Sequence, residues 1–163
     1  MFLPESVKLT EVGLRDGLQS VAKPISSKIK LNATQQLVDA GLKQIQVTSF
    51  VHPDWVPQMA DAEAVCAGLP EAEDVVFSGL VLNAKGVERA AAAGLKRVEA
   101  SISTSDTHSR KNANMSLDEA MVHLKKMVTL AHNSGIEARG GLQSVWGCVY
   151  DGYWAAERIT EMV

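Results

Sequence analysis

Gly94-Leu-Lys-Arg-Val-Glu-Ala, at residues 94–100, is nearly repeated by Gly41-Leu-Lys-Gln-Ile-Gln-Val at residues 41–47. A third run, at residues 135–141, also starts on glycine and leads into an isoleucine. Each run directly follows a segment whose apolar residues recur at helical spacing. A helix that stops at glycine and turns within a few residues into a strand is half of a βαβ unit, so the repetition predicts a parallel sheet.

The clearest of these helices is predicted at residues 117–134, where apolar side chains from Leu117 to Ala131 form one stripe. Ser116 and Glu119 make a capping-box pattern at its start, and Gly135 provides its stop. The same reasoning predicts the remaining helices at residues 27–40, 58–68 and 85–93, with a fifth beginning near residue 152.

Two further apolar runs, at residues 7–12 and 75–82, bring the number of predicted strands to about five. An open doubly wound sheet and a (βα)₈ barrel share this local pattern. Polar residues follow every predicted strand, as expected for a barrel, whose active site lies at the carboxyl ends of its strands. These residues are Arg15-Asp16, Thr48-Ser49, Asn83, Ser101-Ser103-Thr104 and Gln143-Ser144. The sequence therefore favours an α/β fold that is part of a TIM (βα)₈ barrel, with about five parallel strands and four to five helices.

Composition narrows the class of protein. The 163 residues are 46% hydrophobic and 21% charged, which is typical of one globular domain. A net charge of -3 without a long basic run argues against nucleic-acid or polybasic membrane partners. Cys66 and Cys148 match no zinc spacing and indicate two reduced thiols. No signal-peptide pattern or long apolar run occurs, so we expect a cytoplasmic protein.

The densest group of candidate residues is 10–19, in which a predicted strand ends in Arg15, Asp16 and Gln19. An aspartate at a barrel mouth can bind a hard divalent cation, and an adjacent arginine can stabilise developing negative charge on oxygen. Taken alone, the same residues also fit an ordinary surface turn in which Arg15 pairs with Asp16.

A long loop, residues 46–61, follows the second predicted strand and contains two prolines and a tryptophan. Trp55 and Met59 fit either a plug in the barrel mouth or a substrate contact. His52 has no carboxylate partner visible in the pattern and is interpreted as a loop residue rather than a general base. Cys148 likewise lacks a neighbouring histidine in sequence and is interpreted as a packed thiol.

Residues 11–19 and 48–61 together closely resemble the hydroxymethylglutaryl-CoA lyase family. Both motifs are long, and weaker matches at residues 83–86, 109–114 and 139–152 extend the similarity over nearly the whole chain. With these motifs combined, the surface-turn interpretation of Arg15 and Asp16 becomes the minor one.

The resemblance implies roles for six residues. Asp16 is expected to be one ligand of a bound Mg²⁺ or Mn²⁺, and Arg15 to face the reacting thioester. Gln19, Gln46, Ser49 and Asn83 match positions that line the family's substrate site. The implied reaction is a retro-Claisen cleavage of an acyl-CoA thioester, which for hydroxymethylglutaryl-CoA gives acetoacetate and acetyl-CoA. Gln46 departs from the family pattern, which usually has a glutamate there.

The resemblance also implies that residues 1–163 form the N-terminal part of such a barrel. A complete barrel takes about 250 residues, and the family's His-x-His ligands, ligating asparagine and catalytic cysteine loop match nothing in this chain. Unpaired strand edges then favour self-association or a complementary chain that supplies the missing strands. The alternative is a half-barrel that is inactive alone or serves as an interaction module.

Overall fold

The computed structural model describes residues 4–162 and contains six α-helices, six short or long strands and two further helical turns. In chain order the elements are η1 (Gly13–Gly17), α1 (Ser27–Asp39), β1 (Gln44–Ser49), η2 (Pro57–Met59), α2 (Ala62–Ala67), β2 (Val76–Val81), α3 (Ala84–Ala92), β3 (Arg97–Ser103), α4 (Asp106–Ala113), α5 (Leu117–Asn133), β4 (Glu137–Gln143), β5 (Gly147–Cys148), β6 (Gly152–Tyr153) and α6 (Ala156–Thr160).

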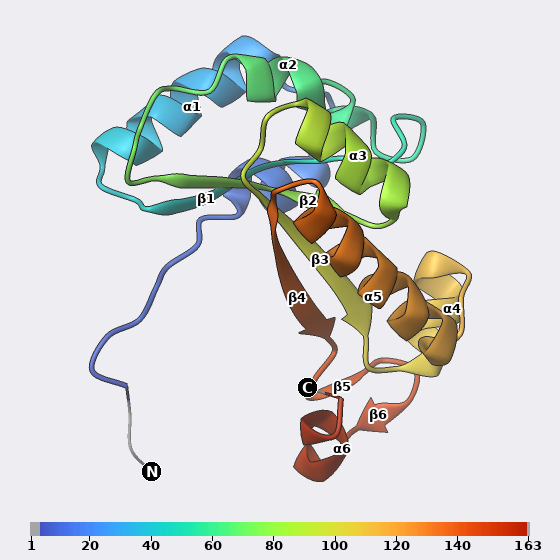
Figure 1. The fold of residues 1–163 in the computed structure, drawn as a ribbon. Coiled ribbons are helices and arrows are strands. Elements are labelled where there is room, and N and C mark those ends of the chain that lie inside the picture. Colours follow the sequence, from blue (N-terminus) through green and yellow to red (C-terminus); the bar gives the residue numbers. More distant parts are fainter. Residues whose placement is uncertain (1–3, 163) are drawn as a thin grey trace.

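Four parallel strands form the main sheet in the order β1-β2-β3-β4, so neighbours in sequence are neighbours in space. Helices α1, α2, α3 and α5 lie along one side of this sheet (Figure 1). Two buried apolar clusters fill the space between the helices and the sheet. One includes Phe50, Val98 and Met127, and the other includes Ile45 and Val65. This is the strand–helix alternation predicted from the glycine-led repeats.

The predicted helix signals are confirmed in detail. Ser116 and Glu119 form a capping box at the start of α5, with each side chain bonded to the other residue's backbone N–H. Gly41, Gly94 and Gly135 follow α1, α3 and α5 with φ values of 89°, 79° and 72°. Only glycine adopts this left-handed conformation without steric cost, so each glycine fixes the point where helix gives way to strand.

The predicted first strand, residues 7–12, was wrong in extent. A single bridge joins Glu11 to Ile45, and two backbone hydrogen bonds of 2.9 and 2.8 Å make this pairing. Val7 and Leu9 are 72% and 68% exposed, and the segment leads away from the sheet (Figure 1). Among residues 4–162 this segment pairs only with β1, and one short contact does not hold a run of extended backbone in a ladder.

Three other elements differ from the sequence prediction. The chain after residue 146 forms a small antiparallel hairpin, β5–β6, before the short helix α6 begins at Ala156. Gly147 and Gly152, with φ of 121° and 76°, allow this reversal. The predicted helix 58–68 is divided into η2 and the shorter α2. Helix α4 was not predicted because its sequence is mostly polar and has no apolar stripe.

The two faces of the sheet differ in chemistry. Because side chains alternate along a strand, Val98 and Ala100 of β3 enter the helix-covered core, whereas Arg97 and Glu99 project to the other face. There Arg97 pairs with Glu137 of β4 at 2.8 Å, and Arg139 of β4 lies 3.8 Å from Glu99. In a barrel this polar face lines the interior. Among the helices of residues 4–162, none has both the length and the apolar composition needed to cross a membrane.

Candidate active site

The turn η1 positions Arg15 and Asp16 directly after the bridge between Glu11 and β1. Backbone N–H groups of both residues donate to the carbonyl of Val12, at 3.0 and 2.7 Å. Leu14, between the glycine and the arginine, is buried in the core cluster that contains Ile45. This apolar contact anchors the turn, so the charged residues that follow Leu14 are held at a defined place beside β1.

The guanidinium of Arg15 connects Asp16 with Gln46 of β1. Its Nε donates to Oε1 of Gln46 at 2.5 Å, and its Nη1 lies 2.6 Å from Oδ1 of Asp16. Gln46 is 3% exposed, the Arg15 side chain is 17% exposed and the Asp16 side chain is 63% exposed. The arginine is therefore fixed from the side of the sheet, while the carboxylate beside it opens to solvent. Three of the six residues singled out in the sequence are brought together here.

The other three lie apart from these contacts. Ser49, fully buried at the end of β1, is 3.4 Å from the carbonyl of Leu80. Asn83 follows β2, and its side-chain oxygen accepts a hydrogen bond from Gly86 at 2.9 Å, which caps helix α3. Gln19 is exposed beyond η1. Because the strands are parallel, Ser49 and Asn83 do share the carboxyl edge of the sheet.

Comparison with known proteins places these features in a family. A family model described as HMGL-like matches residues 6–161, which is nearly the whole chain. The chain belongs to the HMGL-like family. This is the family that the motifs at residues 11–19 and 48–61 resemble.

Individual HMGL-like relatives agree with this. The mitochondrial hydroxymethylglutaryl-CoA lyase of Macaca fascicularis is 38% identical over 160 residues, covering 98% of this chain and 49% of that protein. The crystal structure of a Bacillus subtilis HMG-CoA lyase superposes with a TM-score of 0.93 at 36% identity, over 99% of this chain and 54% of that one. An Acinetobacter baumannii HMG-CoA lyase, solved with coenzyme A and 3-methylmalate, gives a TM-score of 0.89 at 27% identity over 96% and 51% of the two chains.

The chain thus spans about half the length of the HMGL-like relatives that it matches. The agreement in backbone establishes the fold as part of an α/β barrel, as the sequence predicted. In residues 4–162 the parallel sheet has four strands, and the predicted first strand contributes one bridge.

The residues present offer a divalent cation only part of a binding site. Asp16 has the right chemistry, because an exposed carboxylate at a strand end is a hard oxygen ligand. In the part of the chain that the structure describes, however, no group of three or more histidine, cysteine, aspartate or glutamate side chains is placed to hold a metal ion. Asp16 therefore fits one ligand position.

Trp55 and Met59, the two apolar residues singled out in the loop after β1, have different surroundings. Trp55 is 81% exposed, whereas Met59 is buried at 1% exposure beside Thr48. His52 is 64% exposed and lies 3.7 Å from Asp54, a weak loop contact in keeping with its interpretation as a loop residue. A cavity of about 220 Å³ opens between this loop and α3. It is lined by Phe50, His52, Pro53, Asn83, Lys85, Gly86 and Arg89.

Sequence reasoning also missed Arg89, which joins α3 to Glu63 of α2 and to the backbone of this loop. Arg89 contacts both carboxylate oxygens of Glu63, at 2.7 and 3.1 Å, and donates to the carbonyl of Val51 at 3.2 Å. The hydrogen bond from Arg89 lowers the pKa of Glu63. The two residues are 26 positions apart, so no local spacing indicates that they meet.

The two thiols differ from each other. Burial raises the pKa of Cys66 to about 12, so this thiol is inert and packed. Cys148 lies half-buried in the β5–β6 hairpin, where a hydrogen bond from Ser105 lowers its pKa. The expectation that Cys148 is a packed thiol agrees in part with this half-buried position.

Proposed function

We propose that this chain provides the Arg15–Asp16 part of the active site of a carbon–carbon lyase. Its substrate would be 3-hydroxy-3-methylglutaryl-CoA or a similar hydroxyacyl-CoA, cleaved to acetoacetate and acetyl-CoA in the first case. One observation carries the proposal: the Arg15 guanidinium is fixed by the buried Gln46 beside the open carboxylate of Asp16, at 2.5 and 2.6 Å. Family membership supplies the reaction class.

Arg15 is the residue best suited to stabilise the enolate that a retro-Claisen cleavage produces. A guanidinium has five N–H donors, and the contacts to Gln46 and Asp16 leave the Nη2 group for a substrate oxygen. Because Gln46 already fixes the side chain, little conformational freedom is lost when negative charge develops on the thioester oxygen. The amide of Gln46 accepts the Arg15 hydrogen bond without adding a negative charge beside the enolate.

Asp16 would hold a divalent cation, Mg²⁺ or Mn²⁺, through its carboxylate. Such a cation supplies Lewis acidity that favours loss of the proton from the tertiary hydroxyl of the substrate. Asp16 itself has the further role of orienting the Nη1 side of Arg15. Gln19, Ser49 and Asn83 remain proposed substrate contacts, and a cytoplasmic location remains a prediction.

A second candidate is that residues 1–163 are catalytically incomplete and act only with a complementary chain or further strands. Two observations favour it. Barrels close with eight strands, whereas the main sheet of residues 4–162 has four. A full set of metal ligands is likewise missing from those residues. In this case Arg15 and Asp16 are still part of the site, and homo-oligomerisation or a partner would complete it.

Binding and turnover of 3-hydroxy-3-methylglutaryl-CoA test the proposal. Isothermal titration with Mg²⁺ present would compare the wild type with Arg15→Gln, using Arg110→Gln on the exposed face of α4 as the matched control. Loss of a hydrogen bond to a charged group costs about 1.5–3 kcal/mol, so Arg15→Gln should raise Kd by about 10- to 150-fold while the control leaves it unchanged. Equal affinity of wild type and Arg15→Gln would contradict the proposal.

Release of acetyl-CoA, measured in a coupled assay, separates the two candidates. Turnover without any added partner chain would mean that residues 1–163 suffice for the reaction. Thioester binding without turnover supports the incomplete half-barrel.

A further inference from the structure

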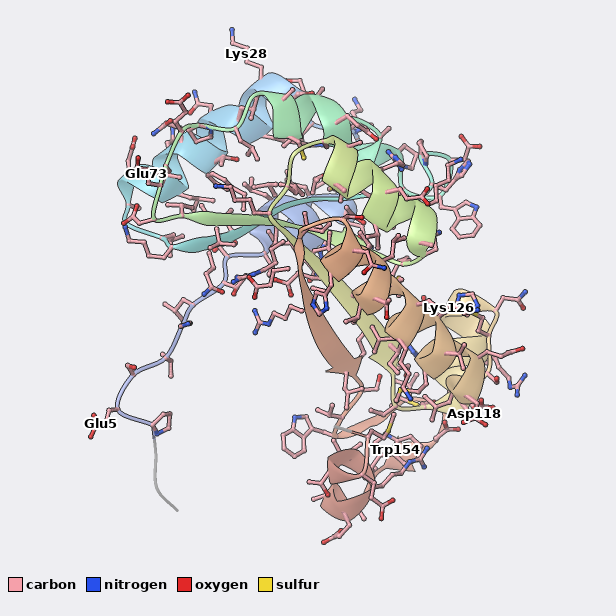
Figure 2. The ribbon with its side chains drawn as sticks, viewed as in Figure 1. Glu5, Lys28, Glu73, Asp118, Lys126 and Trp154 are labelled. Carbon is pink, nitrogen blue, oxygen red and sulfur yellow. The ribbon has the colours of Figure 1, made fainter. Side chains whose placement is uncertain are left out.

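Helix α1 contains a lysine that is almost completely buried. Lys28 points away from the helix into solvent, as lysines usually do (Figure 2). Lys30, two residues later, is 1% exposed. A buried ammonium group is costly unless hydrogen-bonded charges or dipoles surround it, so the contacts of Lys30 need an explanation.

Those contacts come from the segment between β1 and α2. The Nζ of Lys30 lies 2.5 Å from Oδ1 of Asp61 and donates to the carbonyl of Gln58 at 2.6 Å. Ser27, one turn earlier on α1, donates to the other oxygen of Asp61 at 2.7 Å. The ammonium and the carboxylate therefore satisfy each other and two further polar groups, and they join α1 to the end of the loop at residues 50–61.

The contacts around Lys30 and Asp61 also reach the segment that follows Arg15 and Asp16. The side-chain amide of Gln58, whose carbonyl accepts from Lys30, donates to the carbonyl of Val21 at 2.6 Å. At the other end of the loop, Arg89 donates to the carbonyl of Val51. The loop is thus fixed at both ends, and the Lys30 end is also tied to the chain that leaves η1.

A requirement for stability alone does not explain an ion pair at this place. Replacing a buried ion pair with apolar residues of similar volume is often neutral or stabilising. A methionine at position 30 would fill much of the same space as the lysine stem, and Asp61 is 25% exposed, so water can reach it. What an apolar side chain cannot provide is a directed donor that fixes the carbonyl of Gln58 and the carboxylate of Asp61.

We propose that Lys30 is a positioning residue: its ion pair with Asp61 sets the arrangement of loop 50–61 and, through Gln58, of residues 17–25 behind the Arg15–Asp16 pair. This inference rests on the proposed function, in which Gln19, within residues 17–25, and Ser49, directly before the loop, contact the substrate. Lys30 does not touch substrate and acts through Gln58 and Asp61. Removal of its amine should loosen the two segments and weaken thioester binding while the core stays folded.

Hydrogen exchange monitored by mass spectrometry tests, without any ligand, whether Lys30 fixes residues 50–61 and 17–25. Lys30→Met should speed amide exchange in residues 50–61 and 17–25 by at least about tenfold, with exchange in α5 unchanged. Lys43→Met is the matched control, because Lys43 pairs with Asp74 at an exposed site. Unchanged exchange in both segments of Lys30→Met, or equal acceleration in the control, would overturn the inference.

Conservative variants of Asp61 distinguish loss of the ion pair from a general disturbance of packing. Asp61→Asn needs no repacking and should also accelerate exchange in loop 50–61, whereas Asp61→Glu, which keeps the carboxylate, should restore protection. In titrations with 3-hydroxy-3-methylglutaryl-CoA, Lys30→Met should raise Kd at least about tenfold, and Asp61→Glu should stay within about threefold of wild type. Failure of Asp61→Glu to differ from Asp61→Asn in exchange and affinity would contradict a positioning role. If the wild type binds no thioester, the proposed function fails, and the exchange result alone decides the role of Lys30.

Discussion

The contact between Arg15 and Gln46 leads to a quantitative prediction. Gln46→Leu keeps the volume of the side chain but removes the oxygen that accepts from Nε of Arg15 at 2.5 Å. Hydrogen bonds to charged groups contribute about 1.5–3 kcal/mol, and the 17% exposure of Arg15 allows water to replace part of the loss. We therefore expect the free energy of unfolding to fall by about 2 kcal/mol.

Gln46→Glu should behave differently from Gln46→Leu. A carboxylate would make a charge-assisted hydrogen bond with Arg15, about twice as strong as a neutral one. Burial at a position that is 3% exposed imposes an opposing desolvation cost. The two effects have similar size, so stability should stay within about 1 kcal/mol of the wild type.

Urea unfolding followed by far-ultraviolet circular dichroism measures both variants. With a slope of about 2 kcal/mol per molar urea, a loss of about 2 kcal/mol lowers the midpoint by about 1 M. Gln36→Leu, at an exposed position of α1, is the matched control and should change stability by less than about 0.5 kcal/mol. A midpoint for Gln46→Leu within about 0.3 M of wild type would refute the reasoning, since the 2.5 Å contact would then have no net effect on stability.

Two further predictions concern α5 and the thiols. Ser116→Ala removes the oxygen that accepts from the backbone of Glu119 and should cost about 1 kcal/mol in unfolding free energy, measured by urea titration; no loss would mean that solvent replaces the cap. Iodoacetamide at mildly alkaline pH should modify Cys148 well before Cys66, because only the thiolate reacts and the pKa of Cys66 is about 12, and peptide mapping that finds Cys66 modified first would be inconsistent with this burial.

Local sequence signals predicted the helices well because their determinants lie close together in the chain. The stripe of α5 repeats every three or four residues, and its capping pair, Ser116 and Glu119, is three residues apart. The stop glycines work in the same way, since a positive φ is a property of a single residue.

Features that depend on distant partners were not predictable. Residues 7–12 have the composition of a strand, but a strand forms only where a neighbour pairs along its length. Of these residues, Glu11 alone pairs with β1. The buried state of Lys30 depends on Asp61, which lies 31 residues away. The site was predicted in part for the same reason: Arg15 and Asp16 are adjacent in sequence, whereas the contact with Gln46 comes from folding.

The ion pairs on the polar face of the sheet also determine how β3 and β4 align. Arg97 is opposite Glu137, and Glu99 is opposite Arg139. A slip of two residues, which keeps every side chain on its own face, would bring Arg97 opposite Arg139 in one direction and Glu99 opposite Glu137 in the other. Either slip replaces attraction by repulsion, so the alternating charges exclude the misaligned pairings that hydrophobic contacts on the other face would tolerate.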